Sequence, residues 1–118
     1  FINHNVITYL KYNDYYVKKG FNKRPICRKS VVHNVKLKPH LGYYPIQIAA
    51  YKKLVSSICS IYDIPYQVPE DDNGELLTKV HKDSVRGKFN GIVCHYHLTR
   101  GKIDCAGLEL KKIIDELR

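Results

Sequence analysis

Residues 91–107 read GIVCHYHLTRGKIDCAG, and this stretch is the most informative part of the chain for predicting its fold and function. A short apolar run leads to His95, a turn-like segment follows, and Lys102 and Asp104 then stand two residues apart. Imidazole and carboxylate groups are both good ligands for a divalent metal such as zinc. An ammonium group between them in sequence, that of Lys102, can stabilise charge that develops on a metal-bound substrate. The spacing is therefore compatible with a metal site, and equally with a strand end followed by polar loop residues.

This stretch resembles the closing motif of the zinc-dependent N-acetylmuramoyl-L-alanine amidases, whose fold is shared with amidase-type phage lysozymes and peptidoglycan recognition proteins. In that family a Gly-His pair supplies one zinc ligand, and Lys-x-Asp or Lys-x-Cys supplies a catalytic lysine and a further ligand. The resemblance implies that His95 and Asp104 are zinc (Zn2+) ligands and that Lys102 is catalytic, as the stabiliser of the transition state. Two positions depart from the family: Cys94 replaces a Gly, and Cys105-Ala106-Gly107 replaces Pro-Gly-Pro. Cys105 is thus an alternative ligand, while the offset of Asp104 from Lys102 favours Asp104.

The resemblance leaves one ligand to be found near the start of the chain. Residues 1–7 (FINHNVI) read as a strand, and the family's first strand ends in an apolar run followed by His-His, His-Cys or His-Asn. His4-Asn5 matches this pattern, which implies His4 as the remaining zinc ligand. Residues 5–29 then separate it from Ser30, where the family usually carries a further strand, a helix and a hairpin. Three alternatives are open: a fold shortened in the middle, a sequence that lacks internal segments, or a different alignment of its first third to the family.

Residues 30–37 (SVVHNVKL) also read as a strand, and their start resembles a Ser-Ile-Gly-Ile-Glu-Leu strand of the amidases. Asn34 stands where that family has the acidic residue that activates water. The resemblance therefore implies a domain whose hydrolytic base lies elsewhere or is missing.

Periodicity predicts helices in three places. Pro45 suits the first turn of a helix, because its missing N–H has no partner there, and the helix is expected to run from Ile46 to about Tyr62. Its apolar residues recur at intervals of three and four and predict a face toward the core: Ile46, Ala50, Leu54, Ile58 and Ile61, with Ala49 and Val55 flanking it. The exit, residues 62–65, resembles the Tyr-Gly-Ile-Pro-like exit of the amidase helix. A terminal amphipathic helix is expected over residues 108–118, with Leu110, Ile113, Ile114 and Leu117 inward, and residues 8–19 read as loosely helical.

Composition limits the possible classes of protein. A chain of 118 residues, 44% hydrophobic and 26% charged, is expected to form one soluble globular domain over residues 1–118. No apolar run approaches the ~20 residues of a membrane span, and no secretory signal is visible. The sequence opens on Phe1 and contains no Met, so we expect that it lacks its true beginning.

The net charge of +9 indicates an anionic partner, for which nucleic acid and an acidic cell wall both qualify, although a basic surface without a partner stays open. The four cysteines show no C-x-x-C spacing and are expected as reduced thiols, with a Cys94–Cys105 pairing left open.

These observations together favour an α/β fold: a small central mixed β-sheet flanked by a long helix and a C-terminal helix, as in the amidases. The function that the resemblance implies is hydrolysis of the peptidoglycan amide between N-acetylmuramic acid and L-alanine. The setting would be a phage endolysin, cytoplasmic until it reaches the cell wall, or a virion-associated wall hydrolase. Two alternatives are a catalytically degenerate amidase-fold module that binds other virion proteins, and a basic nucleic-acid-binding domain.

Overall fold

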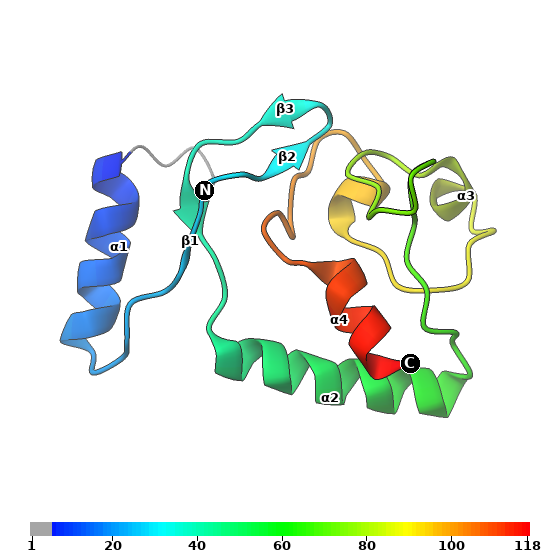
Figure 1. The fold of residues 1–118 in the computed structure, drawn as a ribbon, viewed down its shortest axis with the longest axis horizontal. Coiled ribbons are helices and arrows are strands. Elements are labelled where there is room, and N and C mark those ends of the chain that lie inside the picture. The colour runs from blue at the N-terminus through cyan, green and yellow to red at the C-terminus, as the bar shows by residue number, and fades with distance from the viewer. Residues whose placement is uncertain (1–5) are drawn as a thin grey trace.

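The structure, a computed structural model, describes the backbone of residues 6–118 and the side chains of residues 12–118 (Figure 1). The helices are α1 (Val6–Lys18), α2 (Pro45–Tyr62), α3 (Lys82–Val85), α4 (Leu110–Leu117) and a single 3-10 turn, η1 (His95–His97). The strands are β1 (Ile26–Cys27), β2 (Val31–Val32), β3 (Val35–Lys36) and β4 (His40–Leu41). The expectation of a small protein with both helices and strands is therefore confirmed. None of the described helices is long and apolar enough to cross a membrane.

The strands do not form the central mixed sheet that we predicted. Within residues 6–118 they make two separate two-stranded antiparallel sheets, one of β1 and β4 and one of β2 and β3. Long polar connections without regular structure occupy most of residues 63–109. The described strands therefore form two small sheets in place of one central sheet.

The predicted strand over residues 30–37 is a β-hairpin. His33 and Asn34 lie between β2 and β3 with φ values of 54° and 63°. Two consecutive residues with positive φ form the type of two-residue turn whose twist matches the right-handed twist of the flanking strands. Asn adopts this conformation more readily than most residues. Asn34 thus reverses the chain here, and the hairpin presents His33 at its tip.

Helix α1 confirms the predicted helix over residues 8–19. Its start at Val6 shows that the strand predicted over residues 1–7 does not include Val6 and Ile7, while His4 lies outside the described residues. The buried Asn13 attaches α1 to the segment before β1 through both ends of its amide. Its Oδ1 accepts the Arg24 N–H at 2.9 Å, and its Nδ2 donates to the Arg24 carbonyl at 3.3 Å. A buried amide that is paired in this way avoids the free-energy penalty of unmatched polar groups.

Helix α2 has the limits that the sequence predicted. Pro45 occupies its first turn, and the Gln47 side chain accepts a hydrogen bond from the Tyr44 N–H at 2.8 Å. At the other end Asp63 adopts a left-handed conformation with φ 54°, which ends the helix. Local signals at both ends therefore determine its length.

The orientation of α2 differs from the prediction. Ile46, Leu54 and Ile61, on the face expected to be inward, are 77%, 58% and 73% exposed. Val55, which was expected only at the flank of that face, and Cys59 are buried, at 7% and 5% exposure. A second row of residues at helical spacing, Ile48, Tyr51, Val55 and Cys59, is thus the one turned toward the protein. The helix covers α4 with this row, and an ion pair between Lys52 and Glu116 (Nζ–Oε1 2.6 Å) joins the two helices.

Helix α4 supplies the centre of the core. Leu110 and Ile114 are fully buried and Ile113 nearly so, as predicted, although the helix begins at Leu110 rather than at Leu108. The other buried apolar residues around it come from β2, α2 and the connections: Val32, Val55, Cys59, Val68, Cys94, Tyr96 and Ala106. The segment that carries the candidate site therefore packs directly on the core through Cys94, Tyr96 and Ala106.

Close packing also explains Gly91, at the start of that segment. The Ile92 N–H donates to the Gln67 carbonyl at 2.9 Å, which holds the two backbones together. A Cβ at Gly91 would collide with that carbonyl oxygen and with the Phe89 ring. Glycine is required here for the close approach of two backbones.

Candidate functional site

The structure brings His95 and Asp104 together. Residues 92–94 do not form a strand, and His95 opens the η1 turn. The Tyr96 N–H donates to the Asp104 carbonyl at 3.2 Å, which draws the second half of the motif against the first. His95 Nδ1 and Asp104 Oδ2 are then 3.2 Å apart, with side chains 45% and 40% exposed. The pair is therefore accessible from solvent.

His97 holds the η1 turn in place. Its ring is completely buried, its Nδ1 accepts the Cys94 N–H at 2.8 Å, and its Nε2 donates to the Leu77 carbonyl at 2.6 Å. Because Nδ1 accepts a hydrogen bond, the imidazole is neutral, and burial lowers the pKa of His97 below its usual value. His97 therefore fixes the direction in which the neighbouring turn presents His95. Sequence reasoning missed this role, and the H-Y-H repeat was the signal that could have suggested it.

His33 contacts the backbone of Lys102 from the tip of the β2–β3 hairpin. Its Nε2 donates to the Lys102 carbonyl at 3.1 Å, and its ring lies edge-on to Tyr96 with centroids 6.5 Å apart. The Lys102 side chain is exposed, and no ion pair joins it to a carboxylate of the described chain. The hairpin thus positions the backbone of Lys102 and leaves its ammonium group available. The contact spans most of the chain and has no local sequence signal.

The Cys105 thiol has hydrogen-bond partners other than His95 and Asp104. Its thiol accepts hydrogen bonds from the buried Cys94 thiol and from the Tyr43 hydroxyl, and all four cysteines are free. The bond from Cys94 is the main cause that lowers the pKa of Cys105 to about 6, and the same bond together with burial raises the pKa of Cys94. Burial also raises the pKa of Tyr43 to about 12, so this hydroxyl stays a donor. Of the two alternative ligands, Asp104 is the one in contact with His95.

The geometry of the His95–Asp104 pair suits zinc. His95 Nδ1 and Asp104 Oδ2 are 3.2 Å apart, a hydrogen-bond distance; zinc bonds to nitrogen and oxygen of about 2.0–2.2 Å place two ligand atoms of a tetrahedral site about 3.3 Å apart, so the same arrangement is also compatible with zinc. Over residues 6–118 no group of three or more His, Cys, Asp and Glu side chains gathers in a way that could hold a metal ion. His4, the third predicted ligand, lies outside the described residues. The described part of the chain therefore contributes two groups that fit a zinc site.

The positive charge of the chain is concentrated in its N-terminal half. Eleven basic residues and one acidic residue precede position 63, whereas nine basic and ten acidic residues follow from there onward. No carboxylate side chain lies between Asp14 and Asp63. The residues of β1 to β4 and α2 therefore present cations without local compensation, apart from Lys52, which pairs with Glu116 of α4.

Comparisons with models of protein families, with curated protein sequences and with solved structures find no match to this chain.

Proposed function

We propose that this chain is a zinc-dependent hydrolase domain of the N-acetylmuramoyl-L-alanine amidase type, acting on the amide between N-acetylmuramic acid and L-alanine in peptidoglycan. The observation that carries the proposal is the 3.2 Å contact between His95 Nδ1 and Asp104 Oδ2. These two side chains are the ligands that the motif predicts, and the motif's Lys102 is exposed on the connection between them. The proposed setting is a phage endolysin or a virion-associated wall hydrolase.

Each residue has a distinct role in this proposal. His95 and Asp104 hold the metal together with a third ligand, for which His4 is the candidate. Zinc with an open coordination position supplies Lewis-acid polarisation and lowers the pKa of water. Lys102 stabilises the negative charge that develops on the oxygen of the scissile amide. His97 and His33 do not touch substrate: they position His95 and the Lys102 backbone through the bonds described above.

One observation favours a second candidate function, a catalytically degenerate amidase-fold module that binds within a larger virion assembly. Asn34 occupies the position where the family has its water-activating carboxylate, and the structure uses it as a turn residue with φ 63°. The absence of any acidic residue between Asp14 and Asp63 excludes a near neighbour in sequence as a substitute. A general base would then have to come from another part of the chain.

Elemental analysis combined with cell-wall digestion tests both candidates. The hydrolase is expected to bind about one zinc per chain and to release L-alanine-linked peptides from peptidoglycan. His95→Ala should lose the metal, whereas Lys102→Ala should keep it and lose at least about 100-fold in rate, as is typical for removal of a group that stabilises an oxyanion. Lys88→Ala, an exposed lysine outside the motif, is the matched control and should retain both properties.

The outcomes separate the two candidates. Zinc without any release of peptide would favour the binding module. A wild-type protein that binds no zinc would refute the metal site and the hydrolase with it.

A further inference from the structure

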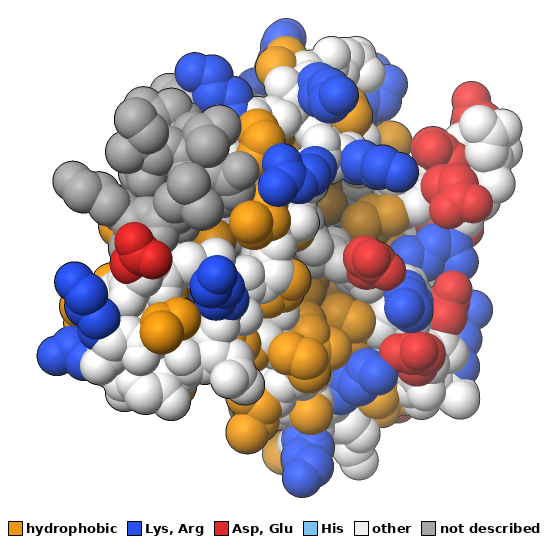
Figure 2. All heavy atoms as spheres, turned by 60° about the vertical axis from the view of Figure 1, so that its left-hand side comes forward, with side chains coloured by type: hydrophobic (Ala, Val, Ile, Leu, Met, Phe, Trp, Pro, Cys, Tyr) orange, Lys and Arg blue, Asp and Glu red, His pale blue; other side chains and the backbone are white. Residues whose placement is uncertain are grey.

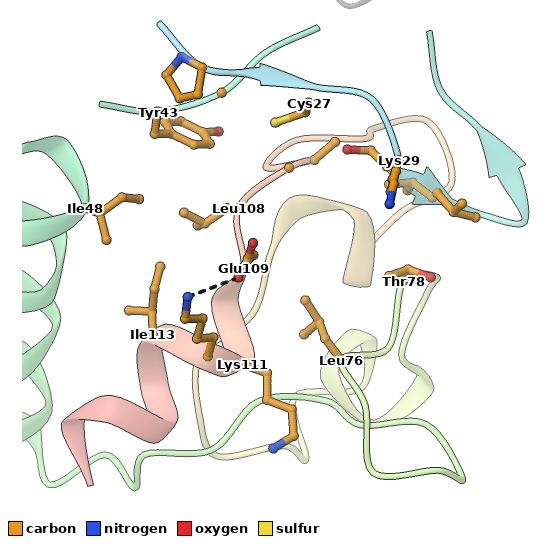
Figure 3. A pocket seen from close by; sticks show the side chains of 18 of the residues that line it. Cys27, Lys29, Tyr43, Ile48, Leu76, Thr78, Leu108, Glu109, Lys111 and Ile113 are labelled. Carbon is orange, nitrogen blue, oxygen red and sulfur yellow. Dashed lines mark ion pairs between the residues drawn. The ribbon is translucent and has the colours of Figure 1, made fainter. Parts of the chain in front are cut away.

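A second feature, apart from the His95–Asp104 pair, is a large cavity beside helices α2 and α4. It has a volume of about 1170 Å³ and lies between the β1–β2 segment, α2, α4 and the loop at residues 75–78 (Figure 3). His95, Lys102 and Asp104 do not line it. Pockets for small organic ligands typically measure about 300–1,000 Å³, so this one is large enough for such a molecule.

The floor of the cavity is apolar. Ile48 reaches it from α2, Ile113 from α4, Leu108 from the segment before α4, and Leu76 from the opposite loop (Figure 3). Figure 2 shows a face of the molecule on which hydrophobic side chains fill a hollow bordered by charged ones. Burial of an apolar group on such a floor is favourable by roughly 25 cal/mol per Å² of surface removed from water. The floor therefore suits the hydrocarbon part of a ligand.

The basic side chains at the rim make ion pairs on one side of the cavity and none with the described residues on the other. On the side of α2 and α4 the lysines are paired with carboxylates: Lys52 with Glu116 at 2.6 Å, Lys112 with Glu109 at 3.8 Å, and Lys111 with Asp115 at 2.7 Å. On the β side Arg28 and Lys29 are exposed, and neither makes an ion pair with the described residues. Lys29 points into the cavity in Figure 3. Glu75 also lines the rim without an ion pair, which leaves two uncompensated cations against one carboxylate.

We propose that this cavity binds a small amphipathic anion, with its hydrocarbon part on Ile48, Leu108 and Ile113 and its carboxylate or phosphate head at Arg28 and Lys29. A head group of this charge forms charge-assisted hydrogen bonds with the two free cations. A cationic amphiphile would meet the same two cations and be repelled. A purely polar anion would leave the apolar floor in contact with water. The binding site is independent of the proposed hydrolase activity, because it shares no side chain with the His95–Asp104 pair.

Titration calorimetry with ligands of one chain length tests the proposal. Decanoate and decyl phosphate, used below their micelle-forming concentrations, are expected to bind once per chain. Decyltrimethylammonium and inorganic phosphate should bind at least tenfold more weakly, because the first lacks the anionic head and the second lacks the hydrocarbon part. Binding of either anion supports the proposal, and the stronger of the two identifies the head group.

Matched variants locate the binding site. The exposed pair Arg28→Glu/Lys29→Glu should weaken decanoate binding at least tenfold. Lys18→Glu/Lys19→Glu, which makes the same change of net charge on and beside α1 and away from the cavity, should change it less than threefold. Ile48→Trp fills the floor from α2 and should also weaken binding at least tenfold.

Three results would overturn the proposal. These are binding of decyltrimethylammonium as tight as that of decanoate, equal affinity in the two charge-reversal variants, and failure of both free anions to bind. Vesicles of anionic phospholipid distinguish a membrane source: protein that binds such vesicles but neither free anion has a basic surface rather than a ligand cavity, which would also refute the proposal.

Discussion

Two neighbouring residues of α2 provide a direct test of how this helix is oriented. Leu54 stands in the centre of the row that the sequence predicted to face the core, whereas Val55, at the flank of that row, is the residue that the structure buries. We predict that Val55→Ala destabilises the protein and that Leu54→Ala does not. The two variants sit side by side in the same helix, so each serves as the control for the other.

The magnitudes follow from exposure. Val55 is 7% exposed and packs in the central cluster. Removal of its two methyl groups loses about 0.8 kcal/mol of transfer free energy for each, with a further contribution from the cavity left behind. Alanine recovers roughly 0.5 kcal/mol through its higher helix propensity, so the net loss of unfolding free energy should be about 1.5–2.5 kcal/mol. Leu54 is 58% exposed, and its replacement should change stability by no more than about 0.5 kcal/mol.

Urea unfolding followed by circular dichroism measures both values. The slopes of the transitions should agree among the three proteins, so that the midpoints alone report the change in stability. If the centre of the predicted face were buried, the order would reverse, and Leu54→Ala would lose about 2–5 kcal/mol, more than Val55→Ala. That result would refute the orientation of α2, and with it the cavity, which Ile48 lines from the same side of the helix.

Three further predictions concern the segment that carries the candidate site. Because burial lowers the pKa of His97 in the folded protein, the unfolded chain takes up a proton at this ring first as the pH falls below about 6.5. Stability should therefore decrease as the pH falls from about 6.5 to the folded-state pKa, by up to about 1.4 kcal/mol per pH unit. In His97→Gln, urea midpoints measured at several pH values should depend less on pH than those of the wild type. An unchanged dependence on pH would show that His97 is not its source. Gly91→Ala should lower the thermal midpoint through collision with the neighbouring backbone, by about 1–3 kcal/mol in stability, whereas Gly101→Ala, where a Cβ meets only ordinary contact, should leave it nearly unchanged. Oxidised glutathione should convert the adjacent Cys94 and Cys105 thiols to an intramolecular disulfide, measured as the paired loss of two free thiols; modification of one thiol alone would show that they do not meet.

The fold was predictable wherever its cause is local. Pro45 and the residues after Tyr62 mark the ends of α2 because the restricted φ of proline and the left-handed Asp63 act on their own neighbourhood. The buried side of α4 was also predictable, since its apolar residues form a single row. Helix α2 carries two rows at helical spacing, and the choice between them depends on what the rest of the chain offers as a partner. The turn at His33 and Asn34 was missed because valines on both sides look like one continuous strand.

The candidate site was likewise predictable only in part, and His95 and His97 show why. The two imidazoles are chemically identical and stand two residues apart on one short turn, yet one is open to solvent and the other is fully buried. The difference arises from the Leu77 carbonyl, 20 residues away, which accepts the Nε2–H of His97 and leaves that ring no free position for a ligand. Of these two rings, the one of His95 keeps atoms accessible, as the proposed metal site requires. A motif can therefore indicate which residue types take part in such chemistry, but which histidine is free to do so depends on the backbone that surrounds the other one.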